Sequence, residues 1–194
     1  VLIGSTEWAE KYAEELHQKA VAYVNTDSNS RGTLRAGGSH GLERLLNDVA
    51  REIPDPETGK SLWERMRERA LERARTDEDK KKITDRRDQR IAALGSGSDY
   101  TAFVDHLGVS SLNVGFSGEE GGGIYHSIYD SFDWYARFGD PNFVYGRVLA
   151  QVTGTLLMRL ADAEMLPFDF TSLAETLGTY VDEIEKLKPE GVDV

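Results

Sequence analysis

The opening of the sequence alternates between strand-like and helical patterns, and this alternation restricts the fold more than any other feature. Residues 1–3 have the pattern of the end of a buried strand, and residues 21–24 have that of a second short strand. Between them, large apolar residues recur every four positions, the spacing of one buried helix face: Trp8, Tyr12, Leu16 and Ala20. Two strands joined by a helical crossover pair in parallel. The opening therefore predicts a parallel sheet.

Helices and strands continue to alternate along the chain, which predicts an α/β fold. Residues 41–52 read as a helix with one apolar face, and residues 110–116 as another strand. Asp140-Pro141 is a strong helix start, a cap followed by proline. Apolar faces are expected in two of these helices, at Leu42, Leu45, Leu46 and Val49, and at Val148, Val152, Leu156 and Leu160. A further amphipathic helix is expected over residues 172–187, and a loop over residues 30–38.

Residues 61–83 are strongly helical but crowded with arginine, glutamate and lysine. A charge run of this kind usually covers a solvated face, so we expect a surface excursion here. The alternative is a helix that grips an acidic partner and makes the chain a binding module. Loss of a bound partner in a pull-down when this helix is removed would support the binding-module interpretation.

Composition excludes several classes of function. The formal net charge is −11, which argues against nucleic-acid binding, because phosphate contacts need a basic surface. No apolar run reaches the ~18 residues of a membrane-spanning helix, and no signal-peptide pattern opens the chain. Cysteine is absent, so a metal would have to use carboxylates and histidines. None of these features decides the cellular compartment, and a secreted, periplasmic or membrane-anchored parent protein is compatible with all of them.

Two residues stand out as candidate ligands. Asp27 follows a predicted parallel strand directly, and open α/β sheets place their sites at the carboxyl ends of strands. A carboxylate there binds a metal, acts as a base, or caps a turn. His126 follows three consecutive glycines, which let the backbone approach a site, and neutral imidazole is the commonest metal ligand. The residues alone leave a loop-bonded histidine and a turn-capping aspartate open.

The segment Leu94-Gly-Ser-Gly-Ser-Asp99 is a glycine-punctuated turn that opens a helix. Such a turn can cradle a phosphate at a helix N-terminus, but the spacing matches neither a Walker loop nor a dinucleotide fingerprint. Close approach of a peptide substrate to the backbone is the better functional reading. No nucleophile elbow is present.

Four ordered segments together resemble one family. They are residues 2–10 (LIGSTEWAE), 23–28 (YVNTDS), 94–99 (LGSGSD) and 125–129 (YHSIY), and residues 150–152 and 166–169 add to the likeness. Together they resemble glutamate carboxypeptidase II and its relatives, a group of two-zinc exopeptidases that includes the metal-free transferrin receptor. The resemblance covers nearly the whole chain. It implies a zinc-exopeptidase (phosphorylase/hydrolase-like) α/β domain with a mostly parallel mixed sheet flanked by helices.

The resemblance implies a role for three residues near the metals. Asp27 would ligate one zinc ion and His126 the other, and Tyr125 would polarise the scissile carbonyl. The complete protein would hold two zinc ions, which share a hydroxide, lower its pKa and clamp the tetrahedral intermediate. The family's remaining ligands and its general base correspond to positions before Val1. We therefore expect this isolated chain to be inactive and to hold zinc poorly.

The resemblance also implies contacts with a peptide substrate. Leu2 would line the pocket for the C-terminal residue, and the backbone of Ser96 and Gly97 would approach the substrate. Arg35 would hold an acidic side chain across the scissile bond. The acidic-substrate enzymes add arginines in a strand that here reads Ser111-Leu-Asn-Val-Gly-Phe116, without positive charge. Each charge-assisted hydrogen bond lost removes roughly 1.5–3 kcal/mol, so we predict a broader peptidase.

The family pattern divides the chain into two parts. Residues 1–168 would be the C-terminal part of a peptidase domain, and residues 169–194 the start of a helical domain that carries a homodimer contact. Amino- and carboxypeptidase activity are both compatible with these features. A receptor-like relative that has lost catalysis is the alternative reading of the same fold.

Overall fold

A three-stranded mixed sheet lies at the centre of the computed structural model, which describes residues 2–119 and 124–187. The strands are β1 (Tyr23–Asn25), β2 (Gly32–Gly38) and β3 (Ser111–Gly118), in the order β1-β3-β2. β1 pairs with β3 in parallel, whereas β2 pairs with β3 antiparallel. The α/β class is confirmed. The expectation of a mostly parallel sheet is not met in the described residues, where one of the two pairings is parallel.

The strand β2 replaces the loop expected over residues 30–38. It pairs with β3 along its whole length, from Gly32 opposite Gly118 to Gly38 opposite Leu112. Glycine is poor in isolated strands, so local propensity favours a loop here. In the fold, however, a Cβ atom at Gly32 would collide with the Ser117 carbonyl, so glycine is what lets the two backbones approach. Long-range pairing overrides the local preference.

The N-terminal segment is helical from Ile3 onward, so the prediction of a strand ending at residue 3 is wrong. Ile3 begins α1 (Ile3–Lys11) and is 76% exposed, and α2 (Ala13–Lys19) follows after a break at Tyr12. The predicted buried face is also shifted. Trp8 is 48% exposed, whereas the small side chain of Ala9 is fully buried. The break redirects the chain, so a single fourfold spacing does not describe both helices.

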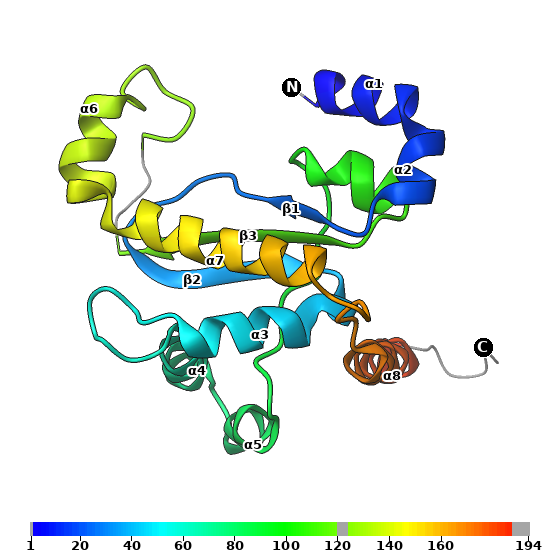
Figure 1. Ribbon diagram of the computed structural model, residues 1–194. Coiled ribbons are helices and arrows are strands. Elements are labelled where there is room, and N and C mark those ends of the chain that lie inside the picture. The colour runs from blue at the N-terminus through cyan, green and yellow to red at the C-terminus, as the bar shows by residue number, and fades with distance from the viewer. Residues whose placement is uncertain (1, 120–123, 188–194) are drawn as a thin grey trace.

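One face of the sheet is covered by helices and holds the main core. On β3, Leu112, Val114 and Phe116 alternate onto this face and are buried. The helices α3 (Glu43–Glu52) and α7 (Val144–Ala161) pack against it and against each other (Figure 1). Both predicted apolar faces are confirmed, because all eight of their residues are buried in this core.

The opposite face of the sheet is only partly covered. Asn113, Gly115 and Ser117 of β3 lie on this face, since they alternate with the core residues. The short π-helix η2 (Ala102–His106) and α1 cover the β1 end, where the Phe103 ring stacks on Tyr23 with centroids 3.9 Å apart. The rest of this face presents amide groups, hydroxyls and glycine backbone.

The charged segment forms two helices instead of one. α4 (Leu62–Arg73) starts with a capping box between Ser61 and Glu64, and α5 (Asp77–Asp85) follows. α4 packs against β2 and α3, and Leu62 is fully buried. The segment is therefore part of the fold on one side and solvated on the other.

The remaining elements connect or flank these layers. They are η1 (His40–Leu42), α6 (Phe132–Trp134), η3 (Tyr135–Gly139), η4 (Pro141–Phe143) and α8 (Phe170–Leu187). The helix predicted over residues 172–187 is confirmed as α8. Within residues 2–119 and 124–187, no helix has the length and apolar character needed to cross a bilayer.

The Asp140-Pro141 start predicted from the sequence begins only the turn η4, and the long helix α7 starts at Val144. The short turn η4 separates Asp140 from α7, yet the Asp140 carboxylate accepts hydrogen bonds from the backbone of Tyr145 at 3.0 Å and Gly146 at 2.7 Å. Asp140 is fully buried. It satisfies backbone donors of the first turn of α7 that would otherwise have no partner.

Candidate functional site

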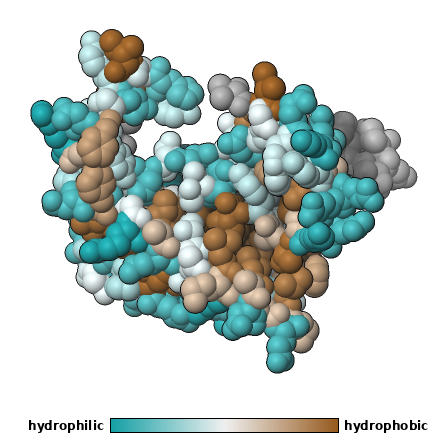
Figure 2. Space-filling model, turned by 45° about the horizontal axis from the view of Figure 1, so that its top comes forward, coloured by the Kyte–Doolittle hydropathy of each residue, from teal (hydrophilic) through white to brown (hydrophobic). Residues whose placement is uncertain are grey.

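A cavity of about 570 Å³ lies on the partly covered face of the sheet. Its lining comes from the residues after β1, from β2, from the glycine turn before η2, from β3 and from Tyr125. Figure 2 shows this side of the molecule hollowed between the lobe that contains α6 and the part that contains α1. Segments distant in sequence thus meet at the carboxyl end of β1, where an α/β sheet places its ligands.

Asp27 is held in a fixed orientation in this cavity. Its Oδ1 accepts a hydrogen bond from the Ser98 hydroxyl at 2.5 Å, and its Oδ2 accepts one from the Asn113 amide at 3.0 Å. The side chain is otherwise exposed. A carboxylate that is oriented by neighbours and open to solvent can still offer lone pairs to a cation or a substrate donor.

A buried amide supports the two residues that orient Asp27. The Asn25 Nδ2 group donates to Ser98 Oγ at 3.3 Å and to Asn113 Oδ1 at 3.1 Å, and Asn25 is 6% exposed. The Tyr23 hydroxyl donates to Asn25 Oδ1 at 3.1 Å. Burial raises the pKa of Tyr23, and the negative charges of Asp99 and Asp27 add to this effect. The network holds the tyrosine in its neutral, donating form.

Sequence reasoning missed this network. Asn25 and Asn113 are partners in the parallel register of β1 and β3, and nothing local indicates that pairing. The alternation of polar and apolar residues in β3 could have placed Asn113 on the open face, but not beside Asp27.

Tyr125 lines the cavity and His126 adjoins it. Their rings stack with centroids 3.7 Å apart, and both side chains are exposed. His126 has a φ of +60°, a left-handed conformation that is uncommon outside glycine and is often found at functional turns. The backbone of Ser127 donates to the Ile124 carbonyl at 2.9 Å, which closes the turn.

The predicted substrate contacts are brought together only in part. Arg35 is opposite Gly115 in the β2–β3 register, so its side chain starts from the open face. Arg35 and Gly97 line the cavity, and Ser96 is the neighbour of Gly97 in the same turn. Leu2 precedes α1 and is not among the described residues that line this cavity, so the structure does not place it with the others.

The donor chemistry of Asp27 and His126 suits zinc, but the described residues do not form a full ligand set. Zinc takes carboxylate oxygen and imidazole nitrogen, and a catalytic zinc usually has three protein ligands. Within residues 2–119 and 124–187, no group of three histidine, aspartate, glutamate or cysteine side chains lies close enough to hold a metal ion. Each of the two residues fits the role of a contributor to a larger site.

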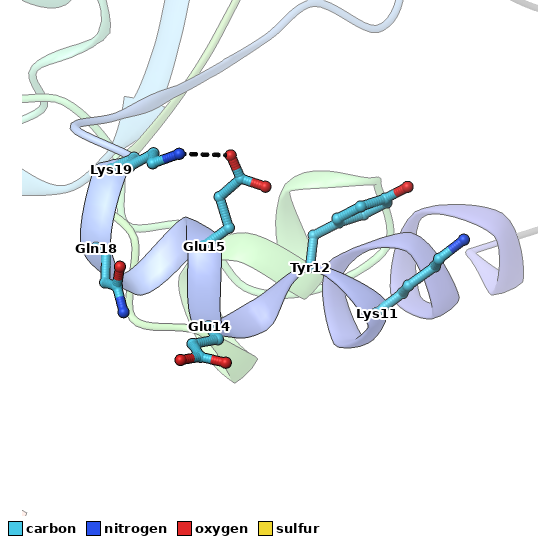
Figure 3. Close-up of a pocket in the computed structure, with 6 residues that line it drawn as sticks. All are labelled: Lys11, Tyr12, Glu14, Glu15, Gln18 and Lys19. Atoms are coloured by element: carbon cyan, nitrogen blue, oxygen red, sulfur yellow. Dashed lines mark hydrogen bonds and ion pairs between the residues drawn. The ribbon is translucent and has the colours of Figure 1, made fainter.

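A second hollow lies at the junction of α1 and α2 and shares no lining residue with the cavity around Asp27 (Figure 3). Its lining is polar and of mixed charge: Lys11, Tyr12, Glu14, Glu15, Gln18 and Lys19. Lys19 and Glu15 pair at 2.9 Å across one helical turn. These are ordinary solvated helix surfaces, and they do not converge on a common point as the residues around Asp27 do.

Comparison with known proteins shows relatives over nearly the whole chain. "Probable glutamate carboxypeptidase LAMP1" of Arabidopsis thaliana is 36% identical over 96% of the chain, and "Probable glutamate carboxypeptidase VP8" of Zea mays is 34% identical over 98%. "Aminopeptidase NAALADL1" of Mus musculus is 30% identical over 93%. The chain spans about a quarter of the length of these curated relatives. No protein-family model matches it.

Proposed function

Over nearly its whole length this chain is a relative of the glutamate carboxypeptidases, and from that relationship we propose that it is the part of a zinc-dependent exopeptidase that binds substrate and supplies one ligand to each of two zinc ions. The observation that carries the proposal is the cavity around Asp27. Asp27, Arg35, Gly97 and Tyr125 belong to four separate segments and line one hollow. The related proteins carry both carboxypeptidase and aminopeptidase names, so the end of the peptide that is trimmed stays open.

The roles of the individual residues follow from their chemistry. Asp27 offers an oriented carboxylate to one zinc ion, and His126 offers an imidazole nitrogen to the other. The hydroxyl of Tyr125 donates a hydrogen bond to the carbonyl oxygen of the scissile bond, where negative charge develops during hydrolysis. Bound zinc supplies a Lewis acid and a water of lowered pKa. Further ligands and a general base complete this site in the parent protein.

Substrate positioning falls to the glycine turn, β2 and β3, which line the same cavity. The turn at Ser96 and Gly97 is exposed and brings peptide backbone to the rim, where it can hydrogen-bond an extended substrate. Arg35 is the cation available to an acidic substrate side chain. β3 presents Asn113, Gly115 and Ser117 to the same space, without positive charge. We propose a broad peptidase, and a strong preference for acidic residues before the cleaved bond would contradict this.

One observation favours a second candidate function, a relative of the same fold without catalysis. Both oxygens of Asp27 already accept hydrogen bonds, and the described residues contain no complete ligand set. In that case Asp27 would act as a structural link between β1, β3 and the glycine turn.

The zinc content of the parent protein distinguishes the two candidates. We expect about two zinc ions per chain after dialysis against chelator-treated buffer, as co-catalytic sites hold two metals. Asp27→Ala and His126→Ala should each lower the zinc content and abolish peptide hydrolysis. The matched controls are Asp105→Ala and His106→Ala, since both residues are exposed and lie outside the cavity. Absence of zinc from the wild-type protein would favour the second candidate, a relative of the same fold without catalysis.

A further inference from the structure

A third cavity, of about 220 Å³, lies along β2 on the side where α4 packs. Four of its lining residues are arginines: Arg35, Arg69, Arg73 and Arg90. Its other described lining residues are neutral, so no carboxylate faces the four cations within the cavity. This concentration of positive charge occurs in a chain whose formal net charge is −11.

The arginines come from three separate segments, and three of them have no ion pair among the described residues. Arg69 and Arg73 are one helical turn apart on α4, and Arg35 is on β2. Among the described residues, Arg35, Arg73 and Arg90 form no ion pair, and Arg69 pairs only with Glu72 of its own helix at 3.0 Å. Burial lowers the pKa of Arg35, and the neighbouring charges of Arg73 and Arg69 lower it further. A bound anion would relieve this repulsion.

Arg90 is held in place from outside the cavity. Its Nη2 group donates to Thr176 Oγ1 and Thr179 Oγ1 of α8, both at 3.2 Å. Its remaining guanidinium donors are left for another partner.

An independent observation also indicates a ligand. Gln89 lines the same cavity and is 6% exposed, and its Nε2 group is buried with no hydrogen-bond partner among the described residues. The Gln89 backbone is fixed by Asn47, whose side chain bonds its N–H at 2.7 Å and its carbonyl at 2.9 Å. A buried donor without a partner is destabilising, so such groups normally have one.

Helix electrostatics alone do not account for this arrangement. A cation in the last turn of a helix interacts favourably with the helix dipole, which explains Arg73 at the end of α4. It does not explain why Arg35 of β2, Arg90 and the unpartnered Gln89 amide line the same space.

We propose that this cavity binds a small multivalent oxyanion, with the guanidinium groups of Arg69, Arg73 and Arg90, assisted by Arg35, supplying the charge and Gln89 Nε2 an additional hydrogen bond. Planar guanidinium groups bind carboxylate and phosphate oxygens in pairs of parallel hydrogen bonds. A phosphate group and a polycarboxylate share this chemistry. The site shares Arg35 with the cavity around Asp27, but Arg69, Arg73, Arg90 and Gln89 do not line that cavity, and the test needs no catalytic readout.

Calorimetric titration of the chain with inorganic phosphate and, separately, with citrate tests the proposal at constant ionic strength. The double variant Arg69→Gln/Arg73→Gln should bind at least about tenfold more weakly, since it removes charge-assisted hydrogen bonds. The matched control Arg75→Gln/Lys81→Gln removes the same charge from exposed positions outside the cavity. It should change the affinity for the anion by less than about twofold, because charges on the exposed surface are screened by salt. Tighter binding of phosphate than of citrate identifies a phosphoryl ligand, and the reverse order a polycarboxylate.

A second variant keeps the proposal testable if the double variant unfolds. Gln89→Met removes the buried donor without changing charge, so it should weaken anion binding while leaving the anion-free chain at least as stable to heat. The proposal is overturned if the wild-type chain binds neither anion at millimolar concentration. Equal losses of anion affinity in the double variant and in its charge-matched control would also overturn the proposal, because they would indicate non-specific electrostatic attraction.

Discussion

The Ser98 hydroxyl donates a 2.5 Å hydrogen bond to the Asp27 carboxylate across 71 positions of the sequence. This bond ties the glycine turn before η2 to the end of β1, and Asn113 fixes the other oxygen. The position of Asp27 in the cavity therefore depends on two neighbours from distant segments.

Replacement of Ser98 by alanine should loosen Asp27 without removing it. If Asp27 ligates a metal in the parent protein, loss of this supporting bond should lower metal affinity about 10- to 100-fold, as seen for residues that orient ligands. Competition with a fluorescent chelator measures the change. Ser110→Ala serves as the control, because it lies outside the cavity lining. Unchanged metal affinity in Ser98→Ala would show that the bond has no role in positioning a ligand.

The two adjacent leucines of α7 should behave oppositely. Leu156 is fully buried in the core, whereas Leu157 is 52% exposed. Leu156→Ala should reduce the free energy of unfolding by about 2–5 kcal/mol, because it removes buried methyl groups and leaves a cavity. Leu157→Ala should change it by less than about 0.5 kcal/mol. Urea unfolding of both variants checks the orientation of α7. Similar losses of unfolding free energy in the two variants would mean that the helix is rotated about its axis relative to the orientation described here.

Asp140 should contribute to stability as a helix cap. Its carboxylate accepts from two backbone donors at the start of α7, so Asp140→Ala should cost about 1–2 kcal/mol of unfolding free energy. Asp140→Asn retains one acceptor oxygen and should cost less. Asp162→Ala, at the other end of α7, is the matched control and should be neutral. In thermal melts, Asp140→Ala should lower the melting temperature most, Asp140→Asn less, and Asp162→Ala not at all. Any other order would contradict the capping role.

Tyr145 should make the chain less stable at high pH. Burial, followed by the negative charges of Glu119 and Glu57, raises its pKa from the ordinary 10.0 to about 12. The folded state therefore keeps the proton between pH 10 and 12, while the unfolded state releases it. Stability should fall over this window by an amount on the order of 1 kcal/mol.

Tyr145→Phe should remove this part of the pH dependence while losing the 3.3 Å bond from the hydroxyl to Glu57. Spectrophotometric titration of the phenol and urea unfolding at pH 9, 10 and 11 measure both effects. An identical pH slope in the wild-type and Phe variants would contradict the assignment.

Local patterns in the sequence predicted the helices α3, α7 and α8, although not the breaks between α1 and α2 and between α4 and α5. The faces of α3 and α7 could be identified because each helix buries a stripe whose spacing is visible in the sequence. The position of Asp27 after a strand followed from the same kind of local pattern. The resemblance to the glutamate carboxypeptidases rested on four short segments, and the comparisons confirm it.

Only the tertiary structure decided which distant segments meet. β2 is a strand because β3 pairs with it, although its three glycines favour a loop. Ser98 and Asn113 orient Asp27, and Arg35 shares a cavity with the arginines of α4, through contacts that no local pattern encodes. Helix faces depend on residues three and four positions apart, which the sequence displays directly. Strand pairing and side-chain networks depend on how the whole chain packs.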